Sequence, residues 1–134
     1  MREFSYFVRN SMVKKQSADT NTAKATARDS YERLEMAKAI LLSQKPKYAL
    51  ENAYEAIREL LDAILYLEGY KSYSHEASVA YMHNLEFSET EIGQVDRLRK
   101  RRNGIKYYGE DVTKEEANGA LQIAEVIMRK LREK

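Results

Sequence analysis

Apolar residues recur at steps of three and four positions along most of the chain, the spacing that puts side chains on one face of an α-helix. A first helix is predicted over about Thr20–Leu42, and it must end before Pro46, because proline disfavours helical conformation in the residue before it. A second helix is predicted over about Lys47–Glu68, with an apolar stripe wide enough for two packing partners. Gly69 is a natural stop for this helix.

Three further helices follow from capping signals. A short third helix is predicted with Ser74 as its N-cap and its end at about His83. The fourth opens with the capping-box sequence Ser88–Glu91 and ends near Tyr108, and the fifth opens with a second capping box, Thr113–Glu116. Helices joined by short polar turns predict an all-α fold, an antiparallel four- or five-helix up-and-down bundle.

The content of helix-breaking residues agrees with this fold class. The chain has one proline and five glycines, all of the glycines at or beyond Gly69, which favours helices over a β protein with many turns. Its 134 residues suffice for one domain with its own core. We place that domain at residues 19–134, after an N-terminal extension at residues 1–18 that is either flexible or docked through Phe4, Phe7 and Val8.

Cysteine content and charge exclude several classes of protein. The absence of cysteine excludes a disulfide framework, a thiol nucleophile and a cysteine-ligated metal site. The net charge of +2 excludes a polybasic arm. No apolar run approaches the ~20 residues of a membrane span, and the first residues lack the apolar stretch of a signal peptide. We therefore expect a soluble, cytoplasmic protein that does not bind a membrane.

The fourth helix carries an arginine where an apolar residue is expected. At about 100° per residue, Ile92, Val95, Leu98 and Ile105 share one arc of this helix, and Arg102 falls near the middle of it. A buried guanidinium must be paired or must line a wet cleft, because an unpaired buried charge costs several kcal/mol. The sequence leaves two interpretations open: an ion pair with a carboxylate, or a site for an anion such as phosphate, which suits a planar fork of donors.

The residues around Arg102 on the fourth helix also bear on whether it forms an ion pair or an anion site. Arg97, Lys100 and Arg101 fall on the opposite side and are predicted to form a solvated face. Gly104 either allows close approach of a backbone or ligand, or is simply tolerated near the helix end. If the site binds phosphate, its candidate residues are Arg99, Arg102, Asn103, Lys106 and Tyr107.

The histidines form no recognisable metal or catalytic motif. His75 and His83 are eight residues apart, so they do not form the i, i+4 pair of a zinc protease helix, and no Glu-x-x-His of a di-iron bundle occurs. No metal or cofactor is therefore predicted. His75 is expected in the first turn of the short helix, in a capping or packing role, and His83 receives no functional interpretation.

Three stretches together resemble a HEPN domain, a small helical family associated with nucleotides and RNA. Ala56–Gly69 resembles the family's long second helix and its glycine stop, and Ser74–Ala77 resembles the short helix that follows. Leu98–Gly109, followed by Val112–Ala117, resembles the Arg-Asn motif and the last helix. With the first helix included, the resemblance covers about residues 20–134.

This resemblance implies a homodimer, and in some family members a partner protein that is a minimal nucleotidyltransferase, in a pair of the toxin–antitoxin type. Many HEPN proteins are metal-independent RNases that use an arginine followed, after four to six residues, by a histidine. Arg102 and Asn103 match the start of that motif, but Tyr107 stands where the histidine is needed. A phenol with a pKa near 10 is a poor base at pH 7.

The sequence therefore predicts a HEPN-like module that binds RNA or a nucleotide and is catalytically incomplete. One alternative is an RNase toxin that uses Arg102, Asn103 and Tyr107. A second alternative is a purely structural helical dimer, in which Arg102 is paired with a carboxylate of the second helix. The carboxylates on or beside the apolar stripe of that helix are Glu55, Glu59 and Asp62.

Overall fold

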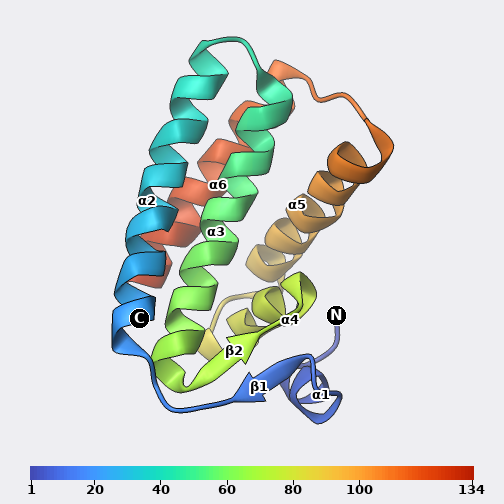
Figure 1. The fold of residues 1–134 in the computed structure, drawn as a ribbon. Coiled ribbons are helices and arrows are strands. Elements are labelled where there is room, and N and C mark those ends of the chain that lie inside the picture. Colours follow the sequence, from blue (N-terminus) through green and yellow to red (C-terminus); the bar gives the residue numbers. More distant parts are fainter.

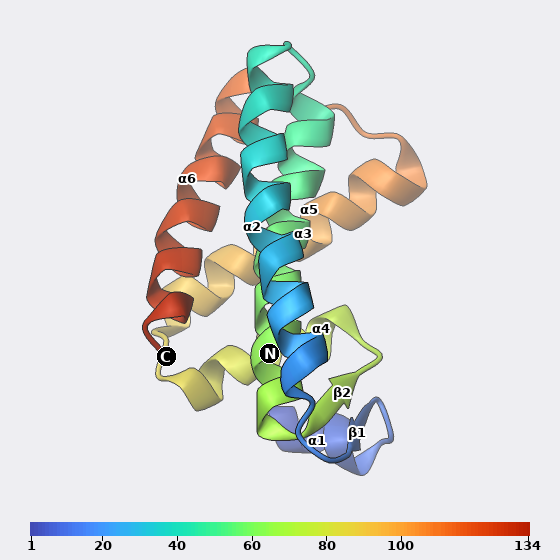
Figure 2. The same cartoon turned by 60° about the vertical axis from the view of Figure 1, so that its left-hand side comes forward.

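The body of the protein is a bundle of long helices, as seen in a computed structural model of residues 1–134. Helices α2 (Thr20–Leu42), α3 (Pro46–Glu68) and α6 (Lys114–Arg132) lie side by side, and α5 (Glu89–Tyr108) packs mainly on α3 and α4. The C-terminal end of α5 points away from the other long helices (Figures 1 and 2). The predicted all-α bundle is confirmed, with a sixth helix that the sequence pattern did not indicate.

The long helices begin and end where local signals place them. Pro46 is the first residue of α3, and Gly69 ends this helix in the left-handed conformation, at φ 84°. At the start of α5, Ser88 and Glu91 form both hydrogen bonds of a capping box. At the start of α6 the predicted box is only half formed: Thr113 accepts from the Glu116 amide, but the Glu116 carboxylate pairs with an arginine of α5 instead.

The short third helix differs from its prediction. The α-helix α4 covers only His75–Ala80 and continues as a 3₁₀ helix over Tyr81–Leu85. Glu86 then takes a positive φ of 65°, which turns the chain toward α5. The predicted N-cap is confirmed, since the Ser74 side chain accepts a hydrogen bond from the Ala77 amide at 3.2 Å.

The main core lies between α2, α3, α5 and α6. Helix α3 supplies the largest share and is buried on two sides, as its wide stripe predicts. Side chains of this helix that are inaccessible to solvent include Leu50, Tyr54, Ile57 and Leu61. None of the helices combines the length and the apolar character that crossing a membrane requires.

The N-terminal segment contains regular structure that the sequence pattern did not reveal. Helix α1 (Phe4–Arg9) is followed by strand β1 (Val13–Lys15), which pairs antiparallel with strand β2 (Tyr70–Ser72) after the end of α3. Phe4 and Phe7 are buried in a second apolar cluster against α4 and α3. These elements lie together at one end of the bundle (Figure 1), so the two phenylalanines dock as the sequence analysis allowed.

Candidate functional site

The inward-facing arginine of α5 lies on the predicted apolar arc. Ile92, Val95, Leu98 and Ile105 are buried against the core, and only 12% of the Arg102 side chain is exposed. One terminal nitrogen, Nη2, lies 3.2 Å from Oε1 of Glu55 on α3. Of the three carboxylates predicted as partners, the structure therefore pairs Arg102 with Glu55.

Behind this ion pair runs a chain of alternating charges along one face of α3. The guanidinium of Arg58 donates to Oε2 of Glu55 at 2.8 and 3.1 Å and to Oδ2 of Asp62 at 2.6 Å. The other oxygen of Asp62 accepts a hydrogen bond from the Ser78 hydroxyl at 2.6 Å. The chain thus links α5 to α3 and α4, and its two arginines balance its two carboxylates.

The two carboxyl groups of this chain respond differently to their surroundings. Burial favours the neutral form of Glu55, but Arg58 and Arg102 outweigh it and hold the pKa of this carboxyl below its usual value. For Asp62, burial dominates and raises the pKa, although Ser78 and Arg58 oppose it. Glu55 is therefore the firmly charged partner of Arg102.

Arg102 keeps hydrogen-bonding capacity that the protein does not use. A guanidinium has five N–H donors, and the protein acceptors near Arg102 are Oε1 of Glu55 at 3.2 Å, which is not aligned for a hydrogen bond, and Oδ1 of Asn103 at 3.4 Å. In contrast, neither oxygen of Glu55 is open to a ligand: Oε2 accepts hydrogen bonds from Arg58, and Oε1 is buried. The remaining donors of Arg102 lie at a surface pocket.

That pocket has a volume of about 350 Å³, at the lower end of the range for small-molecule sites. It lies between the start of α4 and the second half of α5. The structure brings all five predicted binding residues to its wall, together with three residues of the α4 N-terminus that the prediction did not include. Its lining is Ser74, His75, Glu76, Arg99, Arg102, Asn103, Lys106 and Tyr107.

The cations of this pocket differ in how far they are neutralised. Arg99 pairs with Asp96 at 2.8 Å, whereas the exposed Lys106 has no carboxylate within pairing distance. Glu76 is the one carboxylate in the lining. Because Asp96 and Glu55 already pair with Arg99 and Arg102, it is the unpaired Lys106 and the free donors of Arg102 that suit the pocket to an anion.

Sequence reasoning missed the imidazole in this pocket. His75 is the first residue of α4, and its Nδ1 lies 3.3 Å from the hydroxyl of the buried Tyr54. Burial, followed by the nearby Arg58, lowers the pKa of His75, so the ring is neutral at pH 7. His75 lies in the first turn of α4, as expected, and contacts Tyr54. Its place in the same pocket as Arg102 could not be predicted, because the two residues come together only through the tertiary fold.

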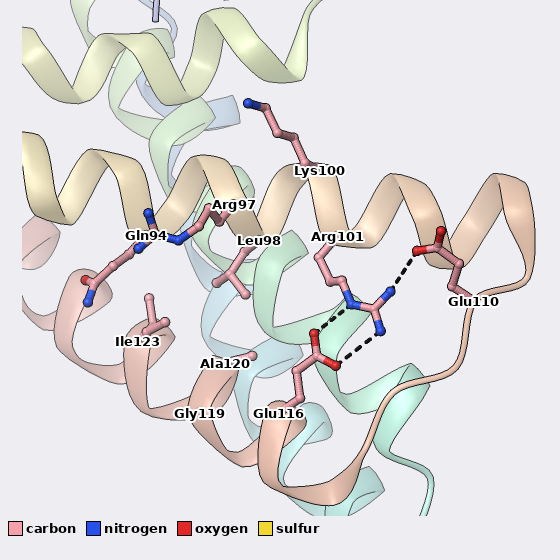
Figure 3. A pocket seen from close by; sticks show the side chains of 10 residues that line it. All are labelled: Gln94, Arg97, Leu98, Lys100, Arg101, Glu110, Glu116, Gly119, Ala120 and Ile123. Carbon is pink, nitrogen blue, oxygen red and sulfur yellow. Dashed lines mark hydrogen bonds and ion pairs between the residues drawn. The ribbon is translucent and has the colours of Figure 1, made fainter.

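The opposite side of α5 is not the uniformly solvated face that was predicted. Arg97 and Lys100 are exposed, but Arg101 is held by Glu116 of α6 at 2.6 Å and by Glu110 at 2.7 Å (Figure 3). Arg101 also donates a hydrogen bond to the carbonyl oxygen of Asp111. These contacts are possible because α6 begins directly across from the C-terminal half of α5.

Gly104 likewise serves an intramolecular contact. A side chain at this position would collide with the carboxylate of Glu110, the group that Arg101 binds. The group that comes close to this glycine is therefore the end of the Glu110 side chain and not a backbone segment. Between α5 and α6 a second groove of about 600 Å³ remains, with Arg97 and Lys100 on its α5 side (Figure 3).

Comparison of the chain with protein-family models gave no match, and comparison with curated proteins gave none either. The structure contains no group of three or more histidine, aspartate or glutamate side chains placed to hold a metal ion.

Proposed function

We propose that this protein is a HEPN-like module that binds a phosphate group of RNA or of a nucleotide in the pocket between α4 and α5. The observation that carries the proposal is the partly satisfied guanidinium of Arg102 at this pocket, with Arg99 and Lys106 beside it. A planar fork with free donors binds phosphate in two-pronged fashion, and the neighbouring lysine adds a point charge that no carboxylate neutralises.

The same residues support a binding module more than a complete enzyme. Tyr107 lies at the rim of the pocket with 64% of its surface exposed, where its phenol can serve as a hydrogen-bond donor or its ring as a surface for stacking. The homodimer, the minimal nucleotidyltransferase partner and the pairing of toxin–antitoxin type remain predictions from the resemblance to the HEPN family.

The proposal is tested by titrating the protein with fluorescein-labelled oligouridylate and, in competition, with uridine monophosphate at low salt. We expect Arg102→Ala to weaken both ligands about tenfold or more, which is the cost of one charge-assisted phosphate contact. Arg33→Ala is the matched control, because Arg33 also pairs with a carboxylate of α3, Glu59, but lies outside the pocket. Equal affinities for the wild type and Arg102→Ala would leave the ion pair with Glu55 as a purely structural contact.

A second candidate function is metal-independent RNA cleavage, which the position of His75 favours. A neutral imidazole in the same pocket as Arg102 can accept the proton of a 2′-hydroxyl. In this case RNA is cleaved in the presence of EDTA, and His75→Gln and Arg102→Ala both abolish cleavage. If Tyr107 takes the catalytic role instead, Tyr107→Phe abolishes cleavage and His75→Gln does not. Intact RNA after incubation at several pH values contradicts both forms of this candidate.

A further inference from the structure

The outer face of α5 joins the phosphate pocket to the groove on the other side of the helix. Lys100, Asn103 and Tyr107 are spaced three and four residues apart, so they form one column along the helix surface. We call these three residues the outer column. Asn103 and Tyr107 also line the pocket with Arg102, and Lys100 also lines the groove with Arg97. The outer column thus connects the pocket to the groove.

We propose that the ligand of this protein is a single-stranded polynucleotide that enters the pocket at Arg102 and crosses α5 over the outer column to Arg97. This inference rests on the proposed function, because it assigns the ligand of the same pocket. Lys106 and Arg97 mark the two sides of the path and lie about 14 Å apart along the helix axis, too far for one phosphate to contact both. A mononucleotide would use only the pocket.

The side chains along this path combine charge with an aromatic surface. The Lys100 side chain is 68% exposed and extends away from the groove into solvent (Figure 3). Arg97 is exposed and has no carboxylate within pairing distance. Tyr107 presents an open ring, with the ammonium of Lys106 at 5.6 Å from the ring centre. Cations for phosphates next to an aromatic ring for a base are typical of single-strand binding sites.

The carboxylates near α5 set the limits of the path. Asp96 is mostly buried and is already paired with Arg99 and Lys100, so it does not oppose a phosphate strongly. Glu110 and Glu116 stand on the far wall of the groove around Arg101. Their charge neutralises Arg101 and disfavours phosphate there, so the path ends at Arg97 and does not follow the groove.

A nucleic acid strand fits this surface better than an acidic protein segment. Both would meet the cations, but each nucleotide of a strand also brings an aromatic base to place on Tyr107, with a hydrogen-bonding edge to offer the amide of Asn103. The Asp and Glu side chains that give an acidic segment its charge have no aromatic face for Tyr107. We therefore assign the surface to single-stranded nucleic acid and use an acidic polymer as the competing outcome.

The test measures the affinity of fluorescein-labelled oligouridylates of one, two, four and eight nucleotides at about 50 and about 200 mM salt. We expect affinity to rise with length, and the double substitution Arg97→Gln, Lys100→Gln to weaken the eight-nucleotide ligand about tenfold. The slope of log affinity against log salt should fall by about 1.4, the value for two lost single-strand contacts. Binding of the mononucleotide should not change, because neither residue lines the pocket.

The matched control is the double substitution Arg28→Gln, Arg129→Gln, which removes the same charge from exposed positions on α2 and α6. The inference is overturned if the eight-nucleotide ligand binds no more tightly than the mononucleotide, or if the α5 variant has no larger effect than this control. Displacement of the eight-nucleotide ligand by polyglutamate as effectively as by unlabelled oligouridylate overturns it in favour of an acidic partner. Failure of the proposed function looks different: no ligand binds, or Arg102→Ala changes nothing.

Discussion

The charge chain behind the pocket predicts that Arg58 is the most sensitive position of the site for stability. Arg58→Met replaces the aliphatic part of the side chain but removes the cation that holds both Glu55 and Asp62, at donor–acceptor distances of 2.6 to 3.1 Å. Removing one partner of a buried ion pair costs about 3–5 kcal/mol, because the other charge stays buried without compensation. Arg58 retains 21% exposure, so we take the lower end, about 3 kcal/mol, or about 10 °C in Tm.

The assay is urea unfolding followed by circular dichroism, with Arg33→Met as the control. Arg33 pairs with Glu59 but is 39% exposed, and such surface pairs contribute about 0–1 kcal/mol. Both substitutions remove a guanidinium that pairs with carboxylates of α3, so the difference between them measures the combined effect of burial and of the second carboxylate that Arg58 holds. A loss of less than about 1 kcal/mol for Arg58→Met, or a loss equal to that of the control, would refute the reasoning.

The pH dependence gives a second test of the same prediction. In the wild type the arginines hold the pKa of Glu55 below its ordinary value of 4.5, so this part of the stability is complete above pH 4.5 and is lost as the pH falls through the lowered pKa. Arg58 also opposes the rise that burial causes in the pKa of Asp62, so without Arg58 this pKa is higher still. In the variant, both carboxyl groups therefore become neutral at higher pH than in the wild type, and the cost of the missing cation then disappears. The gap between wild type and Arg58→Met should therefore be widest at pH 7 and narrow below pH 4.5. A gap that stays constant would contradict this account.

Three further predictions concern the pocket histidine, the N-terminal segment and a glycine turn. Because burial lowers the pKa of His75 from 6.5, the fold should lose stability as the pH falls below 6.5. The drop in Tm over this pH range should be smaller in His75→Gln than in His83→Gln. Phe7→Ala should cost about 3 kcal/mol in urea unfolding, since Phe7 is 1% exposed, and a cost below about 1 kcal/mol would mean that α1 is not part of the cooperative fold. Gly69→Ala should destabilise clearly more than Gly109→Ala: both have positive φ, but a side chain at Gly69 would also meet a backbone oxygen at 2.8 Å, so equal Tm values would contradict it.

The bounds of the helices could be predicted because their signals are local. The first long helix covers Thr20–Leu42 as the pattern indicated, and Pro46 and Gly69 set the ends of the next helix through their own backbone preferences. The small sheet could not be predicted in this way. Its strands have three residues each, too few for an alternating pattern, and they pair across the whole of α2 and α3.

In the candidate site too, the features set by local sequence could be predicted and those set by tertiary packing could not. The inward position of Arg102 follows from the helical period, and so does the gathering of the five candidate residues, because they share one helix face. The imidazole of His75 comes from another helix, and its approach depends on how α4 packs on α3 and α5. The ion pair between Arg101 and Glu116 likewise depends on how α5 and α6 pack. It takes the place of the contact that the Glu116 carboxylate would make in the capping box of α6.

The structural and the functional interpretation of Arg102 are compatible, because the ion pair with Glu55 neutralises this arginine without saturating it. Oε2 of Glu55 takes both bonds from Arg58, and only the unaligned Oε1 is left for Arg102. Since Arg58, Arg102, Glu55 and Asp62 sum to zero charge, the fold needs no external anion to tolerate the buried guanidinium. Arg99 is likewise neutralised by Asp96, so a bound phosphate would gain most of its electrostatic attraction from Lys106, while the free donors of Arg102 would fix its position. On this argument, raising the salt concentration should weaken binding mainly through the exposed lysine, whereas substituting Arg102 should change which anions are bound.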